Sequence, residues 1–154
     1  GLVGSEMCIR DSYDLVIEKN KPFLGICVGM QLLATKGHEG QRNNLGLDWI
    51  SGEVRKLIVK QGFKVPHMGW NSLRFNKSHP LFKDVHTNDH FYFVHSYEFK
   101  AFSKNEVLAT TDHAKQIVAA IAKGNIVGLQ FHPEKSQTQG LKIIKNFIKW
   151  DTFI

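Results

Sequence analysis

Residues 23–29, Phe-Leu-Gly-Ile-Cys-Val-Gly, decide the fold of this chain. Phe23–Ile26 is a short apolar run that follows a proline, and such a run predicts a buried strand. Val28–Ala34 has apolar residues at helical spacing and predicts a helix. Cys27 therefore stands on a turn from a strand into a helix, and glycines two residues to either side remove the clashes that a tight turn would create.

A cysteine on such a turn is placed to act as a nucleophile. The dipole and free N–H groups of the following helix favour a thiolate, so we expect a lowered pKa for Cys27. The backbone N–H of Val28 can donate to a developing oxyanion. The alternative is a purely structural, buried cysteine with two glycines nearby that have no role in a turn. This alternative stays open because short motifs match by chance.

A second motif follows the predicted strand Ile126–Phe131. His132 comes directly after it, at the end of a strand, where α/β active sites gather. Pro133 ends the strand pairing. Glu134 can accept a hydrogen bond from the imidazole and fix its tautomer. Cys27, His132 and Glu134 would then supply a nucleophile, a base and its orienter, although a solvated surface loop would carry the same His-Pro-Glu.

The remaining pattern predicts strands on both sides of these motifs, helices at both ends and a hairpin turn at Gly124-Asn125. This is the pattern of a mixed α/β sheet that is covered on both faces. The predicted helices are Tyr13–Lys19 and Leu141–Trp150, and the other predicted strands are Trp49–Lys60, Val65–Asn71, His90–Phe99, Val107–Thr111 and Ile117–Ala122.

Composition narrows the function classes. The chain has 154 residues, 42% apolar and 22% charged, which suits one globular domain. Its net charge of +6 is dispersed, which predicts a solvated basic surface and no nucleic-acid partner, while a docking face for an acidic partner or for phosphorylated metabolites stays open. No apolar run is long enough to cross a bilayer, so we expect no membrane partner.

The cysteines and histidines exclude two kinds of site. Two cysteines without CxxC spacing make neither a disulfide scaffold nor a zinc site, and they fit a catalytic thiol in the reducing cytoplasm. His86 and His90 are separated by a turn-like run, so we expect no metal site.

Four motifs carry a family resemblance that runs from about Tyr13 to the C-terminus. GICVGMQLLA at 25–34 and QFHPEKS at 130–136 resemble the class I, triad-type glutamine amidotransferases. VPHMGWN at 65–71 and FYFVHSY at 91–97 are similar to the glutaminase subunit or domain of imidazole glycerol phosphate synthases, enzymes of histidine biosynthesis. The resemblance implies a mixed, mostly parallel central sheet flanked by helices, and no cofactor.

The resemblance also implies roles at the site. Cys27 would attack the side-chain amide of L-glutamine and form a glutamyl thioester, with His132 as base and then acid and Glu134 orienting it. Gln31, Ser96 and Tyr97 would bind glutamine, the last two largely through backbone groups. Gln31 could instead be an ordinary exposed helical residue.

In this family, ammonia passes to a partner (β/α)₈ cyclase. Tyr92, Lys135 and the PHMGWN stretch, with Trp70, would lie towards that partner. The alternatives are core aromatics and a solvated lysine, and for Phe91 and Phe93 a place in the core is the favoured interpretation.

The chain departs from the family before Cys27. Members begin with strands upstream of the nucleophile and carry a PGVG-type oxyanion loop, and nothing here matches these. We expect residues 1–12 to be a non-native segment and residues 13–154 to be a partial amidotransferase domain that lacks its first strands. Losing one oxyanion donor costs about 2.7–4 kcal/mol, so we expect this chain alone to be a poor enzyme. The rival hypotheses are another triad amidotransferase and a truncated, non-catalytic module that docks on the cyclase.

Overall fold

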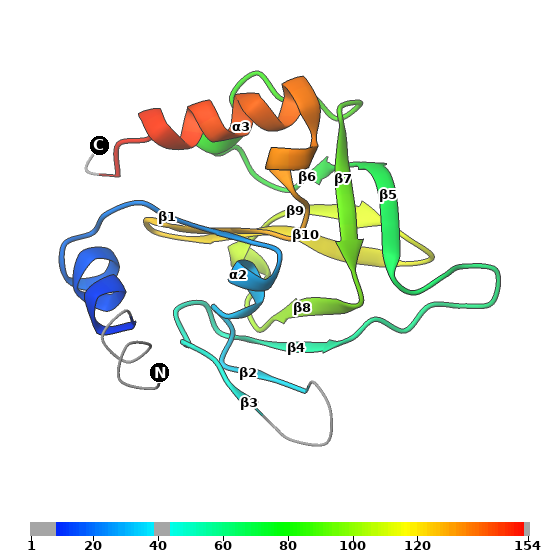
Figure 1. The fold of residues 1–154 in the computed structure, drawn as a ribbon, viewed down its shortest axis with the longest axis horizontal. Coiled ribbons are helices and arrows are strands. Elements are labelled where there is room, and N and C mark those ends of the chain that lie inside the picture. Colours follow the sequence, from blue (N-terminus) through cyan, green and yellow to red (C-terminus); the bar gives the residue numbers. More distant parts are fainter. Residues whose placement is uncertain (1–8, 39–43, 153–154) are drawn as a thin grey trace.

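The computed structural model describes residues 9–38 and 44–152. Figure 1 shows helix α3 (Gln137–Lys149) along one side of the strands and the short helix α2 (Val28–Gln31) on the other. The remaining helical segments are a π-helix and three 3₁₀ turns: η1 (Asp14–Glu18), η2 (Pro80–Phe82), η3 (Lys104–Glu106) and η4 (Pro133–Lys135). The strands are β1 (Phe23–Ile26), β2 (Lys36–Gly37), β3 (Asn44–Leu45), β4 (Gly52–Lys56), β5 (His67–Ser72), β6 (Arg74–Phe75), β7 (His90–His95), β8 (Tyr97–Ala101), β9 (Val107–Asp112), β10 (Gln116–Lys123) and β11 (Ile126–Leu129).

The central sheet has five strands in the order β1-β11-β10-β9-β6. The predicted mixed α/β sheet with flanking helices is confirmed. Its pairing differs from the expected mostly parallel one, because within the described residues only β1 and β11 run parallel and the other three pairs are antiparallel. The reason is the hairpins: the short turn at Gly124-Asn125 can join β10 to β11 only in antiparallel orientation.

The predicted strand His90–Phe99 is in fact two strands in two sheets. β7 pairs antiparallel with β5, and β8 pairs antiparallel with β4 in a four-stranded sheet of order β3-β2-β4-β8. The chain bends at Ser96, whose carbonyl accepts a hydrogen bond from the Leu57 backbone at 2.8 Å. Alternation continues across this bend, so periodicity alone does not show it.

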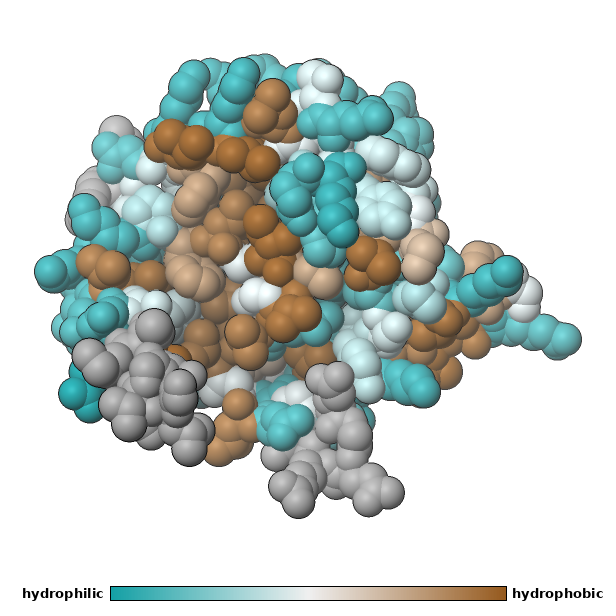
Figure 2. All heavy atoms as spheres, viewed as in Figure 1, coloured by the Kyte–Doolittle hydropathy of each residue, from teal (hydrophilic) through white to brown (hydrophobic). Residues whose placement is uncertain are grey.

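Two hydrophobic clusters cover the two faces of the central sheet. One lies under α3 and β7 and contains Phe91, Phe93 and Phe131, each fully buried, so the prediction that Phe91 and Phe93 are core residues is confirmed. The other lies under α2 and contains Met30 and Trp49. On the face viewed in Figure 2, apolar side chains also reach the surface in a broad band between α3 and the opposite edge.

Helix α2 is shorter than the predicted Val28–Ala34 and ends at Gln31. The backbone carbonyls of Leu32 and Leu33 accept hydrogen bonds from a loop that comes later in the sequence. Leu47 donates to the Leu32 carbonyl at 2.9 Å, and Trp49 donates to the Leu33 carbonyl at 3.0 Å. Tertiary hydrogen bonds thus replace the last helical turn.

Residues 9–13 are helical and continue into η1. That residues 1–12 are a non-native segment stays a prediction, and residues 1–8, including Cys8, lie outside the described residues. The predicted helix Tyr13–Lys19 corresponds largely to η1. Among the helices of the described residues, none has the length and apolar character needed to cross a membrane.

Candidate active site

Cys27 has an uncommon backbone conformation, with φ 54° and ψ −105°. Positive φ in a residue other than glycine costs of order 1–3 kcal/mol and is found where the surrounding structure enforces it. Here β1 ends at Ile26 and α2 begins at Val28, so Cys27 alone makes the reversal. The predicted strand–turn–helix element around the cysteine is present.

The two glycines on either side of Cys27, Gly25 and Gly29, contribute differently to the turn. A β-carbon on Gly25 would lie 2.5 Å from the carbonyl oxygen of Gly29, which no real contact allows. A β-carbon on Gly29 would meet nothing within 4 Å. The expectation that both glycines relieve clashes holds for Gly25, and at Gly29 it is the backbone that makes the close approach.

The parallel pairing of β1 and β11 brings the two sequence motifs together. Ile26 lies opposite Leu129 in the register, and the Cys27 N–H donates to the Leu129 carbonyl at 2.7 Å. Both strands end at this edge, so Cys27 leaves one strand beside the residues that leave the other. Residues about a hundred positions apart in the sequence are therefore neighbours in the structure.

His132 and Glu134 contact each other at this edge. His132 Nδ1 lies 2.5 Å from Glu134 Oε1. The His132 backbone is held by Ser136, whose hydroxyl donates to the His132 carbonyl at 2.5 Å and accepts from the Tyr92 N–H at 2.9 Å. The His132 N–H also donates to the Tyr92 carbonyl at 2.9 Å. The imidazole therefore sits on a backbone fixed by β7 and η4.

Polar groups lie around the Cys27 sulfur. The thiol donates to the Val94 carbonyl at 3.8 Å, and the side-chain amide of Gln130 donates to the sulfur at 3.7 Å. Within the described residues no hydrogen bond joins the sulfur to His132. Catalytic hydrogen bonds are often long in free enzymes and tighten when substrate binds.

Burial raises the pKa of the Cys27 thiol, and the negative charge of Glu134 raises it further. The Val28 N–H, the Gln130 amide and the Lys135 charge lower this pKa but do not outweigh burial. The expectation of a lowered pKa is therefore wrong for this structure. A four-residue helix carries too small a dipole to offset the loss of water around the sulfur.

Gln31 joins the nucleophile to β8. Its Nε2 donates to the Tyr97 carbonyl at 3.3 Å and to Gln130 Oε1 at 3.3 Å. The Tyr97 carbonyl also accepts from His95 Nδ1 at 2.8 Å, and His95 Nε2 lies 2.9 Å from His67 Nδ1. The structure thus places Gln31 and Tyr97 together.

Burial is the main cause that lowers the pKa of both imidazoles in this network, for His67 to about 3. Both shifts favour the neutral form of the imidazole. Periodicity marks His67 and His95 only as members of strands, so sequence reasoning had no signal for this pair or for Gln130.

Ser96 lies beside this network, at the bend between β7 and β8. Its carbonyl is already bonded to Leu57. Its N–H donates to no protein group in the described part of the chain. Ser96 therefore keeps one free backbone donor near Tyr97.

The residues predicted to face a partner lie together on one side of β5 and β7. Trp70 is opposite Tyr92 in the register, and their rings meet edge-on with centroids 5.9 Å apart. Trp70 and Met68 are 50% and 61% exposed, so an apolar pair points outward from β5. Lys135 is exposed on η4.

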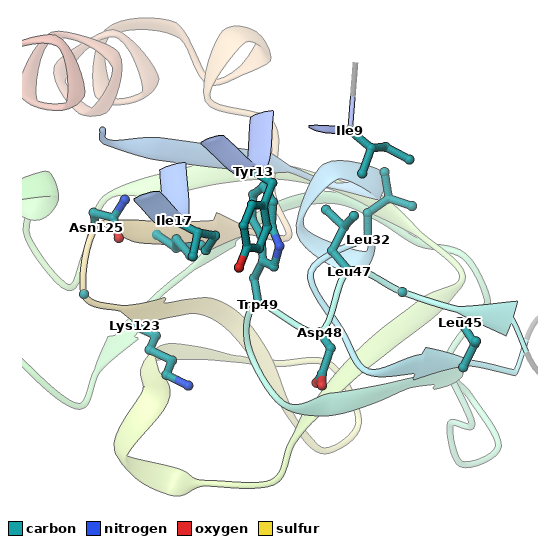
Figure 3. A pocket seen from close by; sticks show the side chains of 13 residues that line it. Ile9, Tyr13, Ile17, Leu32, Leu45, Leu47, Asp48, Trp49, Lys123 and Asn125 are labelled. Carbon is teal, nitrogen blue, oxygen red and sulfur yellow. The ribbon is translucent and has the colours of Figure 1, made fainter. Parts of the chain in front are cut away.

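A cavity of about 980 Å³ opens elsewhere, beneath residues 9–17. Figure 3 shows Tyr13, Leu32, Leu47 and Trp49 around it, and its lining also includes Asp48 and Lys123 but none of the predicted catalytic residues. In the described ranges no group of three or more His, Cys, Asp or Glu side chains is arranged to hold a metal ion. The predicted nucleophile, base and orienter lie away from this cavity, at the ends of β1 and β11.

Comparison with known proteins gives one consistent family. The family model for class-I glutamine amidotransferase matches residues 7–150. The chain is 48% identical over 143 residues to the imidazole glycerol phosphate synthase subunit HisH of Ruegeria pomeroyi, covering 90% of this chain and 67% of that protein. It is also 48% identical over 154 residues to HisH of Brucella abortus, covering 97% of this chain and 71% of that protein.

A solved structure shows the same fold. A glutamine amidotransferase from Thermotoga maritima is similar with a TM-score of 0.59 and 21% identity, covering 99% of this chain and 58% of that one. The chain thus spans 67% and 71% of the two curated relatives and less than two thirds of the solved structure.

Proposed function

The chain belongs to the class-I glutamine amidotransferase family, and we propose that it is the glutaminase part of an imidazole glycerol phosphate synthase. One observation carries the proposal. Cys27, at positive φ on the end of β1, lies beside the end of β11, from which the paired His132 and Glu134 project. A nucleophile, a base and its orienter from two neighbouring strand ends are the parts of a thiol amidohydrolase.

The raised pKa of Cys27 defines what the base must do. A thiol that stays protonated at neutral pH needs a group to take its proton during attack. His132 takes this proton as the sulfur bonds to the side-chain amide carbon of glutamine. It then gives the proton to the leaving ammonia as the carbon–nitrogen bond breaks. Glu134, bonded to Nδ1, leaves Nε2 as the reacting nitrogen.

Water completes the cycle. His132 removes a proton from a water molecule that attacks the glutamyl thioester, and glutamate leaves as the thiol is restored. The Val28 N–H is the backbone donor for the developing oxyanion, and the Val28 side chain is exposed. Gln31 and the free N–H of Ser96 bind glutamine, with Tyr97 between them.

The partner of this proposal is a (β/α)₈ cyclase that receives ammonia. The exposed Met68 and Trp70, with Tyr92 and Lys135, form the proposed docking surface on the same side as His132. Aromatic side chains with apolar neighbours are typical of the centre of protein interfaces.

The test is glutamate release from L-glutamine by the chain mixed with such a cyclase. Cys27→Ala should abolish glutamate release, while ammonium salts still support synthesis by the cyclase. Cys8→Ala is the matched control and should keep the parent rate. Binding to the cyclase without any Cys27-dependent glutamate release would instead identify a docking module, and binding to a different synthase would identify another triad amidotransferase.

A further inference from the structure

Gln130 is a fully buried polar side chain beside the nucleophile. It lies directly after β11, and its backbone N–H donates to the Ala119 carbonyl at 2.8 Å. In the parallel register Ile26 pairs with Leu129. The residues that follow these two in their strands are Cys27 and Gln130, so the register places the Gln130 amide next to the Cys27 sulfur. A buried amide is retained only where it is hydrogen-bonded, and here one partner is the reacting atom.

Hydrogen-bond chemistry fixes which end of this amide faces Cys27. The Tyr97 carbonyl can only accept, so the Gln31 atom beside it is the donor Nε2. The same Nε2 meets Gln130 at 3.3 Å, so the Gln130 atom there is the acceptor Oε1. The other end of the Gln130 amide, Nε2, must then point at the Cys27 sulfur.

The imidazoles of His95 and His67 continue this hydrogen-bond network beyond Tyr97, and the donor and acceptor atoms of each ring are fixed by its partners. His95 Nδ1 donates to the Tyr97 carbonyl, so its Nε2 accepts from His67 Nδ1. His67 Nε2 in turn accepts from Asn71 Nδ2 at 3.3 Å. Each imidazole has one donor and one acceptor in use, so neither ring can turn without breaking a hydrogen bond to its neighbour.

We propose that Gln130 is a further catalytic residue, whose side-chain amide donates a hydrogen bond to the Cys27 sulfur when the sulfur loses its proton. This rests on the proposed glutaminase function and deepens it. As His132 takes the thiol proton, negative charge forms on the sulfur, and a hydrogen bond to a charged acceptor is stronger than one to a neutral acceptor. The bond therefore stabilises the thiolate more than the resting thiol.

The charged groups near the sulfur do not replace this donor. Glu134 opposes the thiolate, and Lys135 favours it from the exposed η4. His132 and His95 also lie in the site, and burial favours the neutral form of His95 by lowering its pKa. Gln130 carries no charge, so replacing it changes the hydrogen bond and leaves these charges in place.

The experiment is the rate of Cys27 alkylation by iodoacetamide between about pH 6 and about pH 10, in a Cys8→Ser background. Gln130→Met keeps an unbranched side chain without a donor. Its matched control is Gln116→Met, which removes an exposed amide on β10 whose bond goes to Thr110. We expect Gln130→Met to raise the pKa of alkylation and to slow the neutral-pH rate by about three- to tenfold, and the control to match the parent.

A Gln130→Met profile that superimposes on that of Gln116→Met would overturn the proposal. If urea unfolding shows that Gln130→Met does not fold, Gln31→Met decides, because it frees the Gln130 amide to turn away. A slower neutral-pH rate in Gln31→Met supports the proposal, and an unchanged rate overturns it. Alkylation needs no glutamine, so a chain with a Gln130-dependent profile but no glutamate release would contradict the proposed function alone.

Discussion

Gly25 and Gly29 approach so closely that a β-carbon on Gly25 would lie 2.5 Å from the Gly29 carbonyl oxygen. The contact closes the turn that carries Cys27. Since backbone blocks the space, an alanine at position 25 must displace β1 or α2.

We expect Gly25→Ala to lower the free energy of unfolding by about 1–3 kcal/mol, as overpacking in a closed site does. Urea unfolding measures the change. Gly29→Ala is the control, since its β-carbon meets nothing within 4 Å, and it should stay within about 0.5 kcal/mol of the parent. Equal losses in both variants would contradict the steric explanation.

Glu134→Gln should lower the pKa of Cys27, because the Glu134 charge raises it. The neutral-pH rate of iodoacetamide alkylation should increase by about two- to tenfold. Glu18→Gln, an exposed change on η1, is the control and should not alter the rate. A slower reaction in Glu134→Gln would show that the carboxylate helps the thiolate instead of opposing it.

Acid should destabilise the fold through His67. Its pKa is about 3 in the folded chain, against about 6.5 for an unfolded histidine, so the unfolded state binds more protons between these values. Stability therefore falls as pH drops below about 6.5, by up to about 1.4 kcal/mol per pH unit for this group.

In His67→Gln the unfolding free energy should vary less between pH 7 and pH 4.5 than in the parent. Exposed His86, changed to Gln, is the control and should keep the parental slope. Urea unfolding at several pH values gives both slopes. Parallel curves for parent and His67→Gln would rule out His67 as a source of acid sensitivity.

Ser136→Ala should cost about 1–3 kcal/mol, because it leaves the Tyr92 N–H and the His132 carbonyl without their shared partner. Thermal or urea unfolding measures the loss. Exposed Ser78→Ala should change stability by less than about 0.5 kcal/mol. No loss in Ser136→Ala would mean that the two backbone groups find other partners.

The elements that sequence predicted well are those whose signals are local. Phe23–Ile26 is a strand with the predicted bounds, and Gly124, at φ 58°, makes the predicted hairpin turn. A hydrogen bond joins Gln31 and Tyr97, and the glutamine-binding role that the family resemblance implies for them stays a prediction.

What sequence could not predict depends on contacts between distant residues. The length of α2 is set by a loop around Trp49, and the bend at Ser96 is set by Leu57. The direction of the Cys27 pKa shift depends on how much protein surrounds the sulfur, which no motif reports. Gln130 falls within the predicted strand Ile126–Phe131, and only the register against Cys27 shows its contact.

Asn125 has a consequence for how the chain opens. Its side-chain amide donates to the backbone carbonyls of Val16 and Lys21, at 2.8 and 2.6 Å. Its backbone carbonyl accepts from the Phe23 N–H at 2.9 Å. One side chain thus links η1 to the β10–β11 turn, beside the cavity of about 980 Å³ beneath residues 9–17. Such a segment detaches as a unit at a lower free energy than the whole molecule, so amide hydrogens in η1 should exchange with solvent well before those of β9 and β10.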